Sequence, residues 1–366
     1  MPEPPARTSL RATLSPRGTL RFPPLKPPRV FVRKLDSERS ERTTHPHFMT
    51  IKDFKSQAVK SLDKSPSPAL DVEILLCHFL QLDKTHLLLN QNTEIPEEKL
   101  TLLLDALTRR QTGLPVAYIT NHKEFFGYDY FVTPDVLIPK PDTEILVEKA
   151  ITFLEEKITA NPDRILTVCD MCTGSGCIGI SVLKALFEEK KIPLERLPKF
   201  TLVDISAPAL EVARKNAERL LSNEKASPAT PVASKSKLRE RIRFVQSNLF
   251  EMLPYQFDVV LTNPPYVPAS LTEELLQDGR SEPRLALDGD VTITGDKSDS
   301  DDGLEIIRNL MPQLGEHVAP TGFFLMETGE YNMRGAENLS YRAGFRDSQV
   351  FEDLEGQERV LYGEKH

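Results

Sequence analysis

The feature that most constrains this fold is the alternation, after Asp142, of short apolar segments with longer amphipathic ones. Such alternation is typical of βαβ units, in which helices join parallel strands. The predicted strands are Ile165–Cys169, Phe200–Val203, Ile242–Val245, Asp258–Leu261 and Gly322–Met326, and the helices between them include Gly179–Glu189 and Pro208–Leu221. The sequence therefore predicts an α/β fold with a parallel sheet, whose ligands bind at the carboxyl ends of the strands.

The segments before this alternation have helical spacing. Residues 68–82 place Leu70, Ile74, Cys77 and Leu80 on one side of a helix, and residues 96–110 repeat the pattern after a proline and acids. We expect a small helical domain, a β-hairpin linker around Gly127 and Tyr128, and an α/β domain with two polar, turn-rich insertions that are unlikely to pack. The predicted ranges are 49–122 for the helices, 123–140 for the linker, 141–366 for the α/β domain, and 222–237 and 290–302 for the insertions.

The first 48 residues differ from the rest in charge. Residues 1–35 hold eight basic side chains and one acid, Glu3, for a net +7, so the remainder carries −15 of a total of −8. Their high Arg and Ser content and their scarcity of acids favour a mitochondrial transit peptide and a place in the matrix. Nine prolines in residues 1–48 would interrupt the amphipathic helix of such a peptide. A disordered basic tail, or translation from Met49 and a cytoplasmic protein, remain the alternatives.

Composition excludes several classes of protein. The acidic body argues against a broad nucleic-acid-binding face, and no apolar run approaches the length of a membrane span. We therefore expect neither direct nucleic-acid binding nor membrane association, and a monomer. The chain's four cysteines suit a reducing compartment. Cys169, Cys172 and Cys177 have no nearby His or fourth thiol to complete a tetrahedral metal site, so no metal is expected.

A glycine loop follows the first predicted strand. Gly174, Gly176 and Gly179 match the spacing of a dinucleotide fingerprint, which by itself suits NAD as well. Asp170 at the strand end and the small loop residues favour S-adenosylmethionine, because a carboxylate repels a pyrophosphate but attracts an ammonium and a sulfonium. Asp204 ends the next strand, where a carboxylate binds ribose hydroxyls. Its alternative role is that of a helix N-cap or turn residue.

A second motif, Asn263-Pro264-Pro265-Tyr266, follows the strand that ends at Thr262. The prolines hold Asn263 and Pro264 extended, so the Asn263 side-chain oxygen and the Pro264 carbonyl form a rigid pair of acceptors. A planar NH₂ group donates both hydrogens to them and turns its nitrogen toward an electrophilic methyl, with Tyr266 as an aromatic wall. Orientation does this work without a general base. The alternative is a rigid turn with no chemical role.

Several segments together resemble the HemK/PrmC family of protein N5-glutamine methyltransferases. They are Asp170–Ile178, Asn263–Tyr266, Gly113–Thr120, Lys123–Gly127, Val136–Glu148, Ser281–Leu287, Asp302–Leu304 and Asp353–Gly363. The resemblance implies a Rossmann-like class I methyltransferase domain behind a small helical domain and a hairpin linker. It also implies methylation of the side-chain amide of the glutamine in the Gly-Gly-Gln motif of a class I peptide chain release factor, which would be mitochondrial here.

The resemblance also implies roles for individual residues. The cofactor-binding set is Asp170, Cys172, Thr173, Gly174, Ser175, Gly176, Asp204, Asn248, Leu249 and Asn263. Within it, Cys172 to Gly176 line the methionine part, Asp204 binds the ribose, and Asn248 and Leu249 contact the adenine. The glutamine is held by Asn263, Pro264, Pro265 and Tyr266, of which Asn263, Pro264 and Tyr266 are catalytic.

The chain departs from the family pattern at three positions and in one insertion. The family usually has Gly at Cys172, Arg at Lys140 and commonly Asp at Asn248, so the adenine contact is the least secure assignment. Insertion 290–302 is expected to bulge outward. Three rival functions are an N6-adenine methyltransferase of DNA or RNA using the same motif, an NAD-dependent oxidoreductase, and an inactive release-factor-binding protein.

Overall fold

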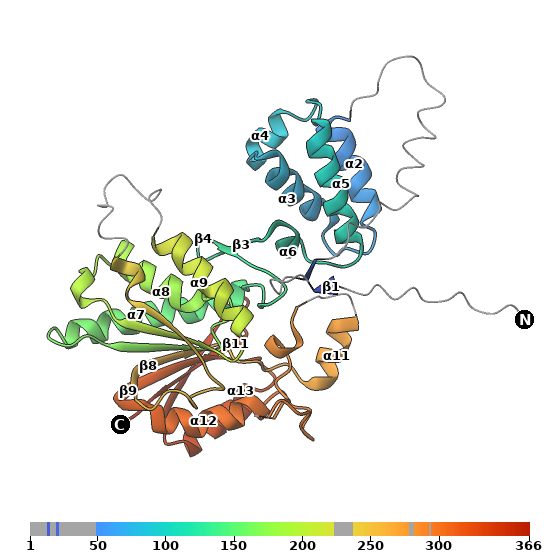
Figure 1. Cartoon of the computed structure of the whole chain (residues 1–366). Coiled ribbons are helices and arrows are strands. Elements are labelled where there is room, and N and C mark those ends of the chain that lie inside the picture. Colours follow the sequence, from blue (N-terminus) through green and yellow to red (C-terminus); the bar gives the residue numbers. More distant parts are fainter. Residues whose placement is uncertain (1–12, 15–19, 22–48, 223–236, 278–281, 293) are drawn as a thin grey trace, which may run out of the picture. The chain divides into compact units, whose positions relative to one another are not determined.

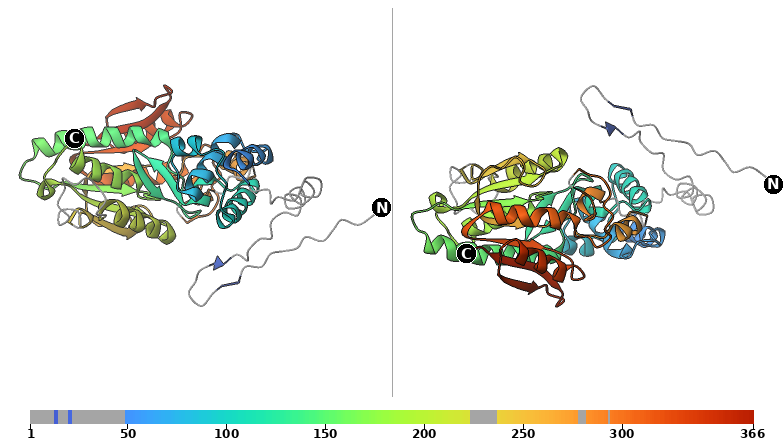
Figure 2. Two further views of the ribbon diagram at one scale, coloured as in Figure 1. Left: turned by 90° about the horizontal axis from the view of Figure 1, so that it is seen from above. Right: turned by 90° about the horizontal axis from the view of Figure 1, so that it is seen from below.

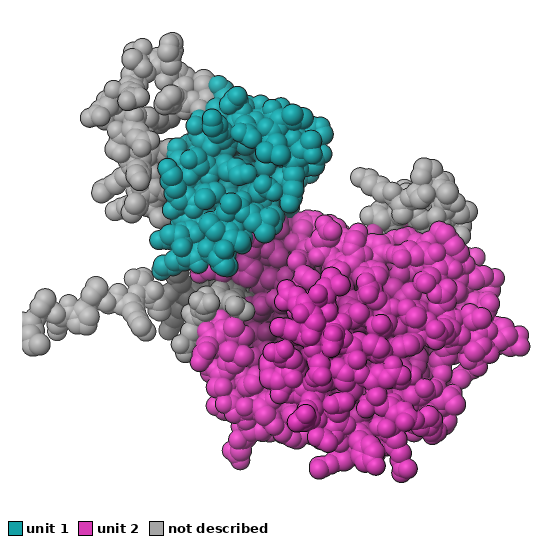
Figure 3. Space-filling model, turned by 180° about the vertical axis from the view of Figure 1, so that it is seen from behind, with its two compact units in different colours: residues 1–111 teal, residues 112–366 magenta. Residues whose placement is uncertain are grey.

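The structure, a computed structural model of the chain, describes residues 13–14, 20–21, 49–222, 237–277, 282–292 and 294–366 (Figure 1). It divides into two compact units, residues 1–111 and 112–366 (Figure 3). Most of the predicted leader, and residues 223–236 of one predicted insertion, lie outside the described residues. Within the leader range, strands β1 (Thr13–Leu14) and β2 (Leu20–Arg21) pair antiparallel.

The first unit is helical. Its helices are α2 (Ile51–Ser61), α3 (Pro68–Leu80), α4 (Lys84–Leu89) and α5 (Glu97–Gln111). Side chains cap two of them, since Thr50 accepts a hydrogen bond from the Asp53 N–H and Asp83 one from the His86 N–H.

The buried face of α3 differs from the prediction. Val72, Leu75 and Leu76 are buried, whereas Leu70 and Ile74 are exposed. Asp71 is buried on the same side of the helix, and its carboxylate lies 2.7 Å from Arg110 Nε of α5. The face that meets α5 therefore combines this ion pair with the burial of Val72, Leu75 and Leu76, a combination that apolar spacing alone does not predict.

The second unit begins with a short helix and a hairpin. Helix α6 (Val116–Thr120) leads into β3 (His122–Phe125) and β4 (Tyr128–Phe131), which pair antiparallel across a two-residue turn. Phe126 and Gly127 both have positive φ, 50° and 71°, as a type I′ turn requires. The unit boundary at 111/112 lies before the predicted boundary at 122, so α6 groups with the hairpin.

A seven-stranded sheet forms the centre of this unit, in the order β10-β11-β9-β8-β5-β6-β7. The strands are β5 (Thr167–Met171), β6 (Lys199–Asp204), β7 (Ile242–Gln246), β8 (Phe257–Thr262), β9 (Val318–Glu327), β10 (Asp347–Glu352) and β11 (Glu358–Glu364). The five predicted strands, β5 to β9, are parallel. The parallel sheet predicted for these five strands is confirmed, and at one edge the sheet is extended by β10 and β11, which form an antiparallel hairpin beside β9.

Helices cover both faces of the sheet (Figures 1 and 2). The helices on its faces are α7 (Glu144–Ala160), α8 (Cys177–Glu188), α9 (Ala207–Leu221), α12 (Glu305–His317) and α13 (Met333–Arg342). Helix α11 (Ala269–Gln277) lies away from the sheet (Figure 1), and single turns are η1 (Pro141–Thr143), η2 (Leu194–Arg196) and η3 (Arg284–Ala286). Along β8, Val259 and Leu261 pack toward α7 and α8, whereas Val260 packs toward α12 and α13. This period of two buries both faces of the strand, as expected of a parallel sheet between helical layers.

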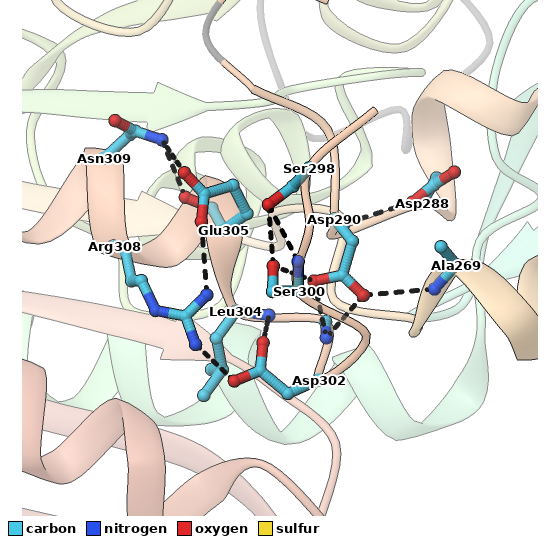
Figure 4. Close-up of polar contacts among 11 residues, drawn as sticks. Ala269, Asp288, Asp290, Ser298, Ser300, Asp302, Leu304, Glu305, Arg308 and Asn309 are labelled. Carbon is cyan, nitrogen blue, oxygen red and sulfur yellow. Dashed lines mark hydrogen bonds and ion pairs between the residues drawn. The ribbon is translucent and has the colours of Figure 1, made fainter. Parts of the chain in front are cut away.

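Insertion 290–302 is exposed over most of its described residues, as expected of a segment that bulges outward, but its first residue is anchored inside the protein. Asp290 is fully buried, and its carboxylate accepts hydrogen bonds from the Ala269 and Gly303 N–H groups and the Ser300 hydroxyl (Figure 4). A bridge between Val291 and Lys297 closes the segment on itself. The polar composition predicted the exposed part of the segment, but it could not show that Asp290 would be buried together with the donors that its carboxylate needs.

Candidate functional site

Three strand ends meet at one edge of the sheet. Because β5 lies between β6 and β8 and is parallel to both, the segments after Met171, Asp204 and Thr262 emerge as neighbours. A cavity of about 320 Å³ lies there. The predicted site residues that line it are Cys172, Thr173, Gly174, Ser175, Asp204, Asn248, Leu249, Asn263 and Pro265.

The two loop glycines have different tasks. Gly174 has φ 54°, and a side chain there would meet no atom within 4 Å, so the backbone is open on that side. Gly176 has φ 79°, and a Cβ would come within 2.8 Å of Ile180 and 3.2 Å of Ala213. Gly174 therefore leaves room beside the loop, whereas Gly176, which does not line the cavity, lets the loop pack against α8 and α9.

Asp170 was expected to face the cavity, but it lies beneath the loop and supports it. Its Oδ2 accepts hydrogen bonds from Thr173 Oγ1 at 2.6 Å and the Gly179 N–H at 2.9 Å. The side chain is fully buried, and Oδ1 has no hydrogen-bond partner among the described residues. Burial raises the pKa of Asp170 to about 7. Its connection to a ligand in the cavity is therefore through the shape of the loop.

Asp204 joins the loop to the end of β6. Its Oδ2 accepts from the Gly174 N–H and its Oδ1 from the Ser206 N–H, both at 2.9 Å. Burial raises the pKa of Asp204, opposed by these hydrogen bonds. Ser206 is the N-cap of α9, so Asp204 is a turn residue that also lines the cavity. Each carboxylate oxygen keeps a lone pair for a ligand hydroxyl.

The Asn-Pro-Pro-Tyr turn is only partly open to the cavity. Asn263 and Pro265 line the cavity, but Pro264 is buried and Tyr266 does not line it. The Tyr266 hydroxyl instead donates a hydrogen bond to Glu327 Oε1 at 2.9 Å. The backbone carbonyl of Tyr266 accepts one from Asn332 Nδ2. The expected aromatic wall is therefore not part of the cavity, because these internal bonds hold Tyr266 beneath the turn.

Two residues that sequence reasoning did not single out contact the turn. Asn263 Nδ2 donates to Thr143 Oγ1 at 3.3 Å, and Thr143 also lines the cavity. Glu327, at the end of β9, is buried and bonded to Tyr266. Thr143 lies within the Val136–Glu148 segment that carried the family resemblance, which was a usable signal for it. Glu327 had no such signal beyond its place at a strand end.

An ion pair that the sequence did not predict lies at the edge of the cavity. Lys140 Nζ lies 2.8 Å from Glu282 Oε1, which also accepts from the Ile138 N–H at 3.2 Å. Lys140 therefore ties the segment before α7 to the segment before η3, and both segments line the cavity. Val291, Thr292 and Gly295 of the insertion line it as well.

The charges of the cavity fit S-adenosylmethionine. Its charged lining residues are Asp135, Lys140, Asp204 and Asp288, an excess of carboxylates that suits a sulfonium and an ammonium better than a pyrophosphate. The open flank of Gly174 and the lone pairs of Asp204 add room and acceptors. Among the described residues no group of His, Cys, Asp or Glu is placed to hold a metal ion, and no helix there is long and apolar enough to cross a membrane.

Comparisons with known proteins identify the family. A PrmC N-terminal domain matches residues 55–120, and a methyltransferase small domain matches residues 146–298. The release factor glutamine methyltransferase of Koribacter versatilis is 33% identical over 322 residues, covering 87% of this chain and 99% of that protein. The enzyme of the same name from Burkholderia pseudomallei is 33% identical over 86% of this chain and 98% of its own length.

Among solved structures, a methyltransferase from Pyrococcus furiosus is 18% identical, with a TM-score of 0.41 over 66% of this chain and 91% of that one. The two bacterial relatives match both the helical unit and the α/β unit, and the cavity fits the cofactor that methyltransferases of this fold use. The chain therefore belongs to the release factor glutamine methyltransferase family and is an S-adenosylmethionine-dependent methyltransferase.

Proposed function

We propose that this enzyme methylates the side-chain amide nitrogen of the glutamine in the Gly-Gly-Gln motif of a class I peptide chain release factor, in the mitochondrial matrix. The bacterial relatives are named for action on release factor glutamine, and they match nearly their whole length. The observation that carries the proposal is the Asn263 side chain at the cavity, whose nitrogen is already bonded to Thr143. That bond leaves Oδ1 as an acceptor for an amide NH₂.

The chemistry depends on orientation. Bound S-adenosylmethionine supplies an electrophilic methyl group on a sulfonium. A glutamine amide nitrogen is a poor nucleophile because its lone pair is delocalised, so holding it in line with the methyl removes much of the entropic cost of the reaction. Asn263 Oδ1 and the Pro264 carbonyl accept the two amide hydrogens, and Pro265 fills the space beside them.

The cofactor assignments are part of the same proposal. Residues 172–176 hold the methionine part, Asp204 binds the ribose hydroxyls, and Asn248 and Leu249 contact the adenine. All except Gly176 line one cavity, which supports a single binding site. The departure at Asn248 keeps a side chain that both donates and accepts hydrogen bonds, so it suits the adenine edge.

Mass spectrometry of a purified mitochondrial release factor tests the substrate. The factor is incubated with S-adenosylmethionine and this protein, and its Gly-Gly-Gln peptide is expected to gain one methyl group on the glutamine. A factor with alanine in place of that glutamine is the matched control and gains none. An unmodified glutamine, under conditions in which a bacterial release factor glutamine methyltransferase modifies it, contradicts the proposal. Label transferred to DNA or RNA instead would support an N6-adenine methyltransferase.

A further inference from the structure

A chain of polar side chains lies beneath the Asn-Pro-Pro-Tyr turn. Parallel pairing sets Thr262 opposite Met326, so the next residues, Asn263 and Glu327, continue from neighbouring strand ends. Glu327 is 1% exposed and Thr143 is 2% exposed. The Thr143 hydroxyl accepts from Asn263 Nδ2 at 3.3 Å. Glu327 and Thr143 are thus shielded from bulk water, so the protein decides the direction of their hydrogen bonds.

The Thr143 hydroxyl is the ambiguous member of this chain. A hydroxyl both donates and accepts, whereas the Asn263 Nδ2 only donates and its Oδ1 only accepts. If the Thr143 hydroxyl proton pointed at Asn263, the Asn263 amide would turn its Oδ1 toward Thr143. Its Nδ2 would then face the glutamine that accepts the methyl group. In this structure Asn263 Nδ2 points at Thr143, so the Thr143 hydroxyl proton must point at an acceptor other than Asn263.

The buried carboxyl of Glu327 offers such an acceptor. Its Oε1 accepts from the Tyr266 hydroxyl at 2.9 Å, and its Oε2 has no hydrogen-bond partner among the described residues. Burial raises the pKa of Glu327, while the neighbouring Thr143 and Tyr266 lower it. As a carboxylate Glu327 only accepts, so its free Oε2 can take the Thr143 proton and leave the lone pairs of the Thr143 oxygen to Asn263.

We infer that Thr143 and Glu327 are positioning residues that set the rotation of the Asn263 amide, so that Oδ1 faces the NH₂ group of the methyl acceptor. The inference rests on the proposed function. With the amide rotated by half a turn, its own NH₂ group would face the acceptor NH₂ group. Two donors cannot bond to each other, so the acceptor amide would lose one of its two bonds.

Kinetics of isosteric variants test the inference. Thr143→Val removes the hydroxyl, and Glu327→Gln replaces the carboxylate with a group that also donates. Each is expected to lower kcat about 10- to 100-fold, as loss of one orienting hydrogen bond in the transition state does. The dissociation constant of S-adenosylmethionine should change less than about threefold, because Thr143 and Glu327 act on the position of the methyl acceptor and not on the cofactor.

Two controls separate positioning from folding. Thr143→Ser keeps the hydroxyl and should retain kcat within about threefold of wild type. Thr272→Val is the matched control, since the Thr272 hydroxyl is also buried but has no hydrogen-bond partner among the described residues. It should leave kcat unchanged. Melting temperatures of all variants show whether a loss of rate is a loss of folded protein.

A double variant shows whether Thr143 acts through Asn263. Adding Thr143→Val to Asn263→Ala should cause no further loss of kcat, because the amide that Thr143 orients is already gone. If the double variant loses kcat by the product of the two single-variant factors, the inference is overturned. A Thr143→Val variant that is folded and has wild-type kcat would overturn it as well.

A readout without a methyl acceptor completes the test. In protein labelled with ¹⁵N-asparagine, the Asn263 side-chain NH₂ signal should shift and exchange faster in Thr143→Val and Glu327→Gln than in wild type. An unchanged signal overturns the inference whatever the substrate is. Failure of the wild-type enzyme to methylate the release factor, with these signals behaving as expected, overturns only the proposed function.

Discussion

At the scale of single residues, the proposed mechanism depends most on Asn263. Asn263→Ala removes the side-chain acceptor but leaves the loop at residues 172–176 and Asp204 in place, so binding of the cofactor should persist. We expect kcat to fall at least about 100-fold, the usual effect of removing one orienting group that acts in the transition state. The dissociation constant of S-adenosylmethionine should rise less than about fivefold, because the other residues assigned to the cofactor are unchanged.

Single-turnover transfer and calorimetric titration of the cofactor measure these two effects. Near-normal turnover in Asn263→Ala would contradict the proposed mechanism. A large loss of cofactor binding would instead make Asn263 mainly a cofactor contact, since it also lines that cavity.

Asp170 makes folding stability depend on pH. Its pKa of about 7 in the fold exceeds its ordinary value of 3.8, mainly because of burial. Between these pH values the native state holds a proton that the unfolded state has lost, so the contribution of Asp170 to stability falls as the pH rises from about 4 to about 7. The full change is about 4 kcal/mol, since each tenfold difference in proton affinity between the folded and unfolded states corresponds to about 1.36 kcal/mol.

Asp170→Asn should remove this dependence while keeping an acceptor for Thr173 and Gly179. Urea denaturation of wild type and variant, at intervals from pH 4 to pH 8, gives the difference in free energy of unfolding at each pH. That difference should move in favour of the variant as the pH rises, because the variant has no carboxyl to ionise. Parallel curves would show that Asp170 does not titrate in this range.

At the scale of elements, insertion 290–302 is held by one buried side chain. Asp290→Ala leaves the Ala269 and Gly303 N–H groups without their acceptor, at a cost of about 1–3 kcal/mol for each buried donor. We expect a lower melting temperature and faster proteolysis within the insertion. Asp299→Ala, at an exposed position of the same segment, is the control and should change neither.

The cavity links this element to activity. Because Val291, Thr292 and Gly295 line the cavity, a loosened insertion in Asp290→Ala should also weaken binding of S-adenosylmethionine. Unchanged proteolysis and cofactor affinity in Asp290→Ala would show that the other contacts suffice to hold the segment.

Helix α3 shows where element-scale prediction from sequence stops. The helix was predicted in its observed place, because apolar periodicity and an initial proline are local properties. Its buried face was not, because Val72, Leu75 and Leu76 compete with Leu70 and Ile74 for the core. The choice between the two faces depends on contacts between segments far apart in the chain, among them the Asp71–Arg110 ion pair.

At the scale of the whole molecule, the charge of the chain divides between a basic leader and an acidic body. The first 35 residues carry +7 and the rest −15. We propose that the leader serves import and not catalysis. A variant beginning at Met49 should therefore keep wild-type methyl transfer in vitro and fail to enter mitochondria when expressed as a fluorescent fusion.

Fractionation and microscopy check the import of that variant, with the full-length fusion as control. Mitochondrial location without the leader would overturn the assignment of residues 1–48. A loss of methyl transfer in the purified variant would show that the leader contributes to the enzyme itself.

The sequence by itself determined the α/β class, the five parallel strands and the residues after β5, β6 and β8 that meet at one cavity. It could do so because strand periodicity, glycine loops and Asn-Pro-Pro turns are properties of neighbouring residues. Only the tertiary structure decided that Asp170 lies under its loop, that Tyr266 turns inward to Glu327, and that Thr143 bonds to Asn263. Each of these is a hydrogen bond made in a buried space, and which donor meets which acceptor there depends on how distant segments pack.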